Sequence, residues 1–218
     1  MKLYPILYLN ESQVSATDAL NENYVVVPIE NSLILLNKNQ LKDTTGKWLE
    51  TGENIVKGYI SLNPAEAEDI GDIIHVRSSS AMKGWGPLLY QAAMKAISPS
   101  WLASDENLSA AANNVWNKMY EYSDLYERRY IGNIGGSRYE CATALKSIPS
   151  EEETATEKDF LEFAKKENID PKNIGCFWAY RKKAHDPSLE RMIQNGKQVS
   201  SGVGDNRILT WVNTAKLP

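Results

Sequence analysis

The chain has 218 residues, of which 42% are hydrophobic and 24% charged, as in a folded domain rather than a disordered or fibrous chain. It holds 24 basic and 28 acidic residues, and the resulting net charge of −4 argues against binding nucleic acid through bulk charge. The only cysteines and histidines are Cys141, Cys176, His75 and His185, which excludes a disulfide scaffold, a four-cysteine zinc site and a histidine-rich metal site.

No apolar run reaches the roughly 18 residues that a membrane-spanning helix needs, so we expect no membrane association. The N-terminal apolar run lacks a small-residue cleavage site, and we interpret residues 4–9 as a strand rather than a signal peptide. Two free thiols are typical of a reducing compartment, so we expect a cytoplasmic protein. A gradual shift in composition near Ser123 suggests two parts, residues 1–122 and 123–218, although one domain remains the alternative.

The first half of the chain alternates strand and helix signals. Stretches rich in β-branched and aromatic residues predict strands over residues 24–29, 33–36, 55–62 and 73–77. Polar residues and glycines predict a loop over 38–54, and acidic residues predict a connection over 63–71. Apolar residues then recur at helical spacing from Gly86 to Ile97, with Pro87 suited to the first turn.

After that helix, residues 101–103 predict a short strand and Ser109 begins a second helix, whose apolar face includes Trp116 and Met119. Farther along, residues 139–145 and 175–181 predict strands, and residues 151–168 predict a helix with an acidic start. Asp186 and Pro187 predict the start of a last helix ending at Asn195-Gly196. A loop over 202–205 and a closing strand over 208–212 complete the prediction.

The segment with the clearest chemical signal joins the strand at 73–77 to the helix at 86–97. Its loop holds Gly84 and Gly86, which allow a close approach of the backbone, and Lys83, which adds a positive charge. Free N–H groups at a helix start form an anion site, although a turn without a ligand is the plain alternative. Leu89 replaces the third glycine of a dinucleotide fingerprint, and the Gly-Lys-Ser/Thr ending of a nucleotide P-loop is missing.

This loop resembles the most recognisable motif of the GNAT superfamily of acyl-CoA-dependent N-acyltransferases, Gln/Arg-x-x-Gly-x-Gly/Ala, which reads Ala81-Met-Lys-Gly-Trp-Gly86 here. A second GNAT motif, Asn-x-x-Ala-x-x-hydrophobic-Tyr, resembles the string from Ser109 through Ala112 to Val115-Trp116. The likeness covers roughly residues 24–122 and extends to small GNAT-like proteins of tailed bacteriophages. It implies an α/β (α+β) fold with a mixed, mostly antiparallel central sheet and flanking helices.

The resemblance also implies a site for acetyl-CoA, or another acyl-CoA, as co-substrate, with no metal. The backbone at Ile74 to Val76 would pair with the pantetheine amides, and the N–H groups from Met82 to Leu88 would hold the pyrophosphate. The residues expected to bind acyl-CoA are Ile74, Val76, Met82, Lys83, Gly84, Trp85, Gly86, Leu88 and Ser109. The expected catalytic residues are Tyr120, as general acid, and Asp72, with Asp69 as the alternative base.

Three departures from the GNAT pattern leave two functions open, and one of them is Ser109, which replaces the usual Asn of the second motif. Ala81 replaces the Gln or Arg of the motif, and Trp116 stands where the superfamily commonly has the tyrosine acid, although indole has no acidic proton to give. The first hypothesis is acyl transfer from acyl-CoA to a primary amine. The second is a catalytically inactive GNAT-like protein with a structural or host-interaction role in a phage, within a homo-oligomer or a phage particle.

Other residues have both a plain and a functional interpretation. His75 lies in an apolar strand and is expected to pack in the core rather than to serve in a site. Trp116 and Met119 are expected to fill the core. The basic clusters at residues 128–129 and 181–183 lie beside aromatic residues and could contact nucleic acid, but a solvated face is the preferred interpretation.

Overall fold

A computed structural model gives the structure of residues 14–64, 73–103, 112, 115–116, 119, 125–134, 137–140, 165–166 and 174–218. The chain forms two compact units, each assembled from separate stretches of sequence. The first unit combines the residues up to Leu62 with Arg77–Ala96 and Ala184–Pro218. The second unit combines Asn63–Val76 with Ile97–Lys183. The expected boundary between residues 122 and 123 stays a prediction.

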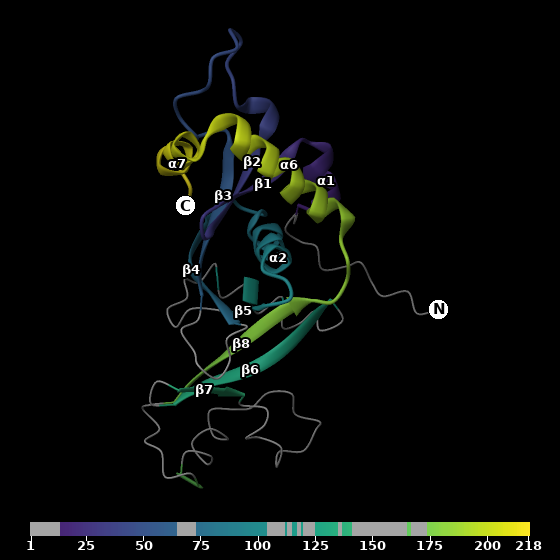
Figure 1. The fold of residues 1–218 in the computed structure, drawn as a ribbon, viewed down its shortest axis with the longest axis vertical. Coiled ribbons are helices and arrows are strands. Elements are labelled where there is room, and N and C mark those ends of the chain that lie inside the picture. The colour runs from purple at the N-terminus through teal and green to yellow at the C-terminus, as the bar shows by residue number, and fades with distance from the viewer. Residues whose placement is uncertain are drawn as a thin grey trace, which may run out of the picture. The chain divides into compact units, whose positions relative to one another are not determined.

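The strands form a mixed, mostly antiparallel sheet with helices beside it, which confirms the predicted fold class (Figure 1). In hydrogen-bonding order they are β1 (Tyr24–Ile29), β2 (Ser32–Asn37), β3 (Val56–Pro64), β4 (Ile73–Ala81), β5 (Trp101–Ala103), β8 (Ile174–Lys182), β6 (Tyr126–Ile134) and β7 (Ser137–Glu140). The pairs β1–β2, β2–β3, β5–β8, β6–β8 and β6–β7 are antiparallel, whereas β4 and β5 are parallel.

The core of the first unit forms around β1 and β2, whose sequences are almost continuously apolar. Such runs are typical of strands that are covered on both faces. Alternate residues of both strands, including Val25 and Ile34, join one cluster with Ile208 and Trp211 of α7 (Asp205–Thr214). The remaining helices of this unit are α1 (Ala16–Asn21), the short 3-10 helix η1 (Lys38–Gln40), α2 (Gly86–Ala96) and α6 (Pro187–Val203).

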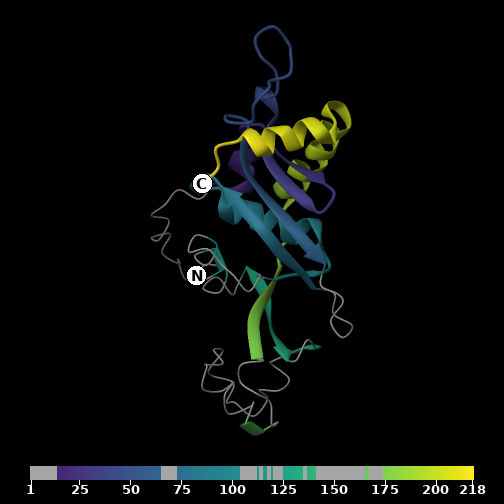
Figure 2. The same ribbon diagram turned by 90° about the vertical axis from the view of Figure 1, so that its left-hand side faces the viewer.

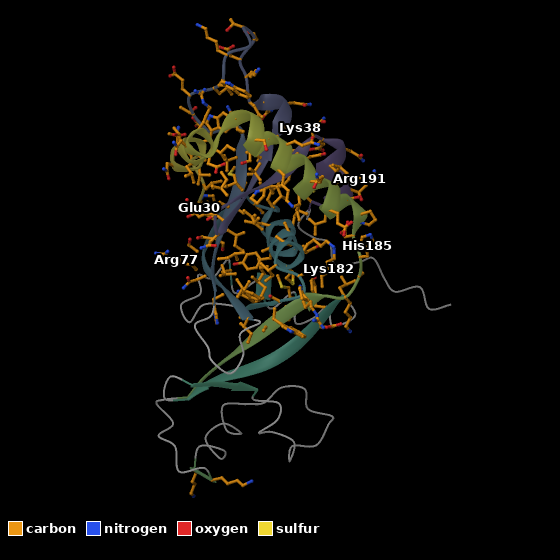
Figure 3. The ribbon with its side chains drawn as sticks, in the orientation of Figure 1. Glu30, Lys38, Arg77, Lys182, His185 and Arg191 are labelled. Atoms are coloured by element: carbon orange, nitrogen blue, oxygen red, sulfur yellow. The ribbon has the colours of Figure 1, made fainter. Side chains whose placement is uncertain are left out.

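The helices of the first unit cover different parts of its strands. α6 lies against β1 and contacts both α1 and α2, while α7 and α2 lie on opposite sides of the strands (Figures 1 and 2). Glu190 in the first turn of α6 forms an ion pair with Lys95 at the end of α2, and one of its carboxylate oxygens lies 3.2 Å from Nδ1 of His185. His185 lies just before α6 (Figure 3). The Lys95–Glu190 ion pair joins the C-terminal end of α2 to the N-terminal end of α6.

Most of the predicted elements in the first half are confirmed. The strands at 24–29, 33–36, 55–62 and 101–103 and the helix from Gly86 correspond to β1, β2, β3, β5 and α2. The strand predicted over 73–77 is longer, since β4 continues to Ala81 through three serines. α1 was not predicted at all, although Ser15 accepts a hydrogen bond from the Asp18 N–H and caps the N-terminus of α1.

The prediction that the last helix ends at Asn195-Gly196 was wrong. Asp186 does cap its start by accepting a hydrogen bond from the Leu189 N–H at 3.1 Å, but α6 continues to Val203. Gly196 instead lies where the helix backbone meets β1, because a Cβ there would be 1.9 Å from the Val26 carbonyl oxygen. The glycine therefore marks a close approach between helix and strand rather than a helix end.

The loop predicted over residues 202–205 was wrong in part, and the strand predicted over residues 208–212 was wrong. Gly202 and Val203 belong to α6, and only Gly204, at φ +86°, separates α6 from α7. Residues 208–212 are helical, and the buried residues Ile208 and Trp211 lie three positions apart on one face of α7. The β-branched residues suggested a strand, but burial follows the helical period.

In the second unit the structure adds a strand that the sequence did not predict. β6 pairs along its whole length with β8, from Tyr126 opposite Lys182 to Ile134 opposite Ile174. The predicted strand at 175–181 is confirmed as β8, and the one predicted at 139–145 begins two residues earlier, as β7. Within the predicted helix from Ser109, Trp116 and Met119 are helical and buried, as expected for core residues.

Several predicted elements lie outside the described residues. These are the strand at 4–9, most of the connection at 63–71, the start of the helix at Ser109, residues 141–145, and the helix at 151–168 apart from the helical residues Lys165 and Lys166.

Candidate functional site

The predicted loop is a tight turn between the end of β4 and the start of α2. The Trp85 N–H donates a hydrogen bond to the Met82 carbonyl at 3.0 Å, which closes a β-turn over Met82–Trp85. Gly84, the third residue of this turn, has φ +87°. A positive φ at this position is characteristic of a type II turn and favours glycine, because a Cβ would be strained there.

Three further contacts hold the turn from other segments of the first unit. The Met82 N–H donates to the Lys57 carbonyl of β3 at 2.8 Å, and the Val14 N–H donates to the Gly84 carbonyl at 3.3 Å. The Trp85 ring packs on the Tyr24 ring of β1, with 4.4 Å between the ring centroids. The conformation of the turn is therefore fixed by residues far from it in sequence.

The N-terminal turn of α2 offers donors for an anion. Pro87 has no N–H, and the Leu89 N–H donates to the Trp85 carbonyl at 3.1 Å. Within the described part of the chain, no backbone carbonyl outside α2 accepts a hydrogen bond from the N–H of Gly86 or Leu88. These two donors lie at the positive end of the helix dipole, where a negative group is favoured.

Two serines near the end of β4 connect the strand to other elements. The Ser79 hydroxyl lies 2.8 Å from the Tyr90 hydroxyl of α2, and the Ser80 hydroxyl donates to the Pro218 carbonyl at 2.6 Å. Adjacent residues of a strand point to opposite faces, so α2 and the C-terminal segment cover opposite faces of β4. Burial raises the pKa of Tyr90, against a smaller lowering by the Ser79 hydrogen bond, so the phenol stays neutral at neutral pH.

The structure places most of the predicted acyl-CoA-binding residues in one continuous stretch. The residues of the turn and the start of α2 are Met82, Lys83, Gly84, Trp85, Gly86 and Leu88. Met82 and Lys83 are exposed, whereas the Leu88 side chain is buried, so Leu88 could contribute only its N–H.

The other predicted site residues divide between β4 and the residues that are not described. Ile74 and Val76 lie in β4, with Ile74 opposite Leu102 of the parallel strand β5. His75 lies between them and is half-buried. Asp72, Asp69, Ser109 and Tyr120 lie outside the described residues, so the expected catalytic pair and one expected acyl-CoA contact stay predictions.

Sequence reasoning did not find the residues that support the turn. Lys57, Tyr24, Ser79 and Tyr90 come from β3, β1, β4 and α2, and no local motif connects them. One signal in the sequence could have indicated a partner for Tyr90. Tyr90 follows the apolar pair Leu88-Leu89 in the helix, and a buried phenol usually has a hydrogen-bond partner.

Other candidate sites find less support. The basic-aromatic cluster of the second unit is at least partly paired internally, since Arg181 Nε donates to Glu127 at 2.8 Å and its guanidinium lies 4.5 Å from the centre of the Trp101 ring. Metal ions and membranes are two further candidates. Among the described residues, no group of three or more His, Cys, Asp or Glu side chains is placed to hold a metal ion. The helices that the structure describes include none with the length and apolarity needed to span a membrane.

No known protein family matches the chain, and no curated protein is significantly similar to it in sequence. The resemblance to the GNAT superfamily stays a prediction from the two sequence motifs, Ala81 to Gly86 and Ser109 to Trp116.

Proposed function

We propose that the protein is a GNAT-like acyltransferase that transfers an acetyl or other acyl group from acyl-CoA to a primary amine. The observation that carries the proposal is the succession along the chain of the strand β4, the Met82–Trp85 turn, the helix α2 and the strand β5, which pairs in parallel with the first residues of β4. This order of elements, with the glycine motif at the turn, is the one that the resemblance implies.

The turn is suited to the pyrophosphate of the co-substrate. The N–H groups of Gly86 and Leu88 would donate to the phosphate oxygens at the positive end of α2. Lys83 is exposed in the same turn and would add a positive charge. None of these contributions requires the side chain that Ala81 lacks, so that departure from the motif leaves the backbone donors intact.

Acyl transfer to an amine places two demands on the rest of the site. The deprotonated amine attacks the thioester carbonyl, the new C–N bond replaces the C–S bond, and the leaving thiolate takes up a proton. We keep Asp72 as the proposed base for the amine and Tyr120 as the proposed acid for the thiolate. Ile74 and Val76 stay the proposed backbone contacts for pantetheine, and Ser109 a further contact to the co-substrate. Since acyl-CoA is plentiful in the cytoplasm, we propose that the protein acts there.

One observation favours the second hypothesis, a GNAT-like protein without catalytic activity that serves a structural or host-interaction role. Trp116 stands where the superfamily commonly has the tyrosine acid, is buried, and packs on Tyr180 with 5.5 Å between the ring centroids. It therefore fills the core of the second unit instead of offering a proton to a substrate. In this case acyl-CoA would bind, or its site would be unused, without turnover.

Isothermal titration with acetyl-CoA tests the proposal, with Gly86→Glu as the disruptive variant. A carboxylate about 4 Å from a phosphate at an effective dielectric constant of about 20 costs roughly 4 kcal/mol. That corresponds to weaker binding by two to three orders of magnitude. The matched control is Gly202→Glu, which makes the same charge change at an exposed position with no atom within 4 Å of the new Cβ.

The results separate the hypotheses. Acetyl-CoA binding by the wild type and by Gly202→Glu, but not by a folded Gly86→Glu protein, supports the pyrophosphate site. Release of free thiol from acetyl-CoA with a panel of primary amines then supports the enzyme, and binding without any turnover supports the inactive protein. A wild type that does not bind acetyl-CoA at millimolar concentration contradicts the acyltransferase.

A further inference from the structure

We propose that Ser79 and Tyr90 form a positioning pair that holds the Met82–Trp85 turn in its anion-binding conformation. The inference rests on the proposed function, because it assigns a role to two residues that support the same site. Neither residue would contact the co-substrate, and both would act through the backbone of the turn.

The pair connects the two elements on either side of the turn. Ser79 lies in β4, three positions before Met82, and Tyr90 lies in α2, five positions after Trp85. Their hydroxyl oxygens are 2.8 Å apart, which is a normal hydrogen-bond distance for two hydroxyl groups. A side-chain hydrogen bond therefore closes a loop from β4 through the turn to α2 and fixes the position of the helix start relative to the strand end.

The surroundings of Tyr90 make this hydrogen bond effective. Tyr90 is 3% exposed, and the neighbouring helix residues Leu88 and Leu89 are buried as well. A hydrogen bond in such surroundings competes little with water. A phenol is neutral at neutral pH and burial raises the pKa of Tyr90 further, so this side chain carries no negative charge that would repel a phosphate at the nearby turn.

The remaining supports of the turn act at other points. Lys57 binds the Met82 N–H, Val14 binds the Gly84 carbonyl, and Tyr24 packs on the Trp85 ring. None of these contacts connects α2 directly to β4. Loss of the Ser79–Tyr90 hydrogen bond should therefore loosen the helix start, where the Gly86 and Leu88 donors lie, and leave the strands of the sheet intact.

The experiment compares Tyr90→Phe, Ser79→Ala and Ser79→Thr with the wild type. Ser79→Thr keeps the hydroxyl and is the conservative rescue. Tyr59→Phe is the matched control, because Tyr59 packs against the core cluster of the first unit, and its hydroxyl has no hydrogen-bond partner in the part of the chain that the structure describes. Amide hydrogen exchange of residues 82–90 is measured without ligand, and acetyl-CoA affinity is measured by titration.

We expect Tyr90→Phe and Ser79→Ala to exchange faster over residues 82–90, with unchanged exchange in β1 and β2, and to bind acetyl-CoA three- to tenfold more weakly. Ser79→Thr and Tyr59→Phe should behave as the wild type. Unchanged exchange over the turn in both hydroxyl-deletion variants would overturn the positioning role. Faster exchange throughout the first unit would also overturn it, since that indicates general destabilisation. So would an acetyl-CoA affinity that is unchanged in both hydroxyl-deletion variants when the wild type binds acetyl-CoA. If the wild type binds no acetyl-CoA but exchange changes as expected, the positioning role is supported and only the proposed function fails.

Discussion

Gly196 offers the sharpest test of how α6 is packed, because the structure gives this glycine no room for a side chain. A Cβ at this position would lie 1.9 Å from the Val26 carbonyl oxygen, 2.4 Å from the Val26 carbonyl carbon and 2.9 Å from the Val27 nitrogen. All three atoms belong to the backbone of β1 and cannot rotate away. In Gly196→Ala, α6 would therefore have to move away from β1 by about 1 Å.

The cost of this movement follows from what α6 buries. Leu189 and Met192 on the same helix are completely buried, so a retreat of the helix opens gaps along their contacts as well. Inserting a methyl group into a well-packed core costs about 1–3 kcal/mol, and more when backbone is displaced. The higher helix propensity of alanine stabilises the helix by up to about 1 kcal/mol, which offsets part of this cost. We expect a net loss of about 2–3 kcal/mol in the free energy of unfolding.

Gly202→Ala is the matched variant in the same helix. No atom lies within 4 Å of a Cβ at Gly202, so only the propensity gain remains, which is roughly 0.5 kcal/mol of stabilisation near the end of a helix. Urea unfolding followed by tryptophan fluorescence measures both changes, with Trp211 as a buried reporter in the same unit. A Gly196→Ala protein as stable as the wild type, or equal losses in both variants, would refute the packing of α6 on β1.

Two further predictions concern the turn and the ion pairs at the start of α6. Gly84→Ala should lower the free energy of unfolding by about 1 kcal/mol because Gly84 has a positive φ, and Gly84→Asn should lower it by less. Thermal unfolding measures both changes. Equal melting temperatures for the wild type and the two variants would contradict the turn geometry. The pKa of Glu190 is lowered from its ordinary value of 4.5, chiefly by the Lys95 hydrogen bond and also by His185. The charged form of Glu190 therefore contributes stability above pH 4.5, and this contribution is lost as the pH falls through the lowered pKa. Urea unfolding should show Glu190→Gln to be slightly less stable than the wild type near about pH 7 and equally stable near about pH 3, whereas a difference that grows on acidification would contradict the ion pairs.

The elements that the sequence predicted well are those with one dominant local signal. β1 and β2 are almost continuously apolar, and the apolar residues of α2 recur at helical spacing after Pro87. Burial in the native state enforces the same periods, so local pattern and tertiary packing agree. The fold class followed from the resemblance, and the sheet of the structure confirms it.

The elements that were mispredicted are those where tertiary contacts override the local signal. Gly196 suggested a helix end by the usual preference of glycine, but the close contact with Val26 requires glycine inside the helix. Residues 208–212 have β-branched side chains typical of a strand, yet Ile208 and Trp211 complete the core of the first unit as neighbours on a helix. β6 was missed because its charged residues, such as Arg128 and Arg129, suggested a solvated surface, although they pair with β8.

For the candidate site, the sequence predicted the turn and its glycines but not what holds them. The pattern from Ala81 to Gly86 is local, and its strand–turn–helix geometry can be inferred from the sequence alone. The contacts with Lys57, Tyr24 and Val14 join residues that are 25 or more positions away in the chain. No local pattern contains such pairings, because they arise only when the strands of the first unit come together.

The way the turn is held also bears on the choice between the two functions. Its supports are backbone hydrogen bonds at Met82 and Gly84, one aromatic contact at Trp85 and the Ser79–Tyr90 pair, and the side chain of Ala81 takes part in none of them. Loss of the Gln or Arg of the motif would therefore remove one contact to the proposed co-substrate without loosening the turn. Loss of the tyrosine at Trp116 is different, since the acyltransferase that we propose would then need another proton donor. The two departures therefore bear on different parts of the proposal: the one at Ala81 leaves the backbone donors of the proposed anion site in place, and the one at Trp116 is the reason for proposing Tyr120 as the acid.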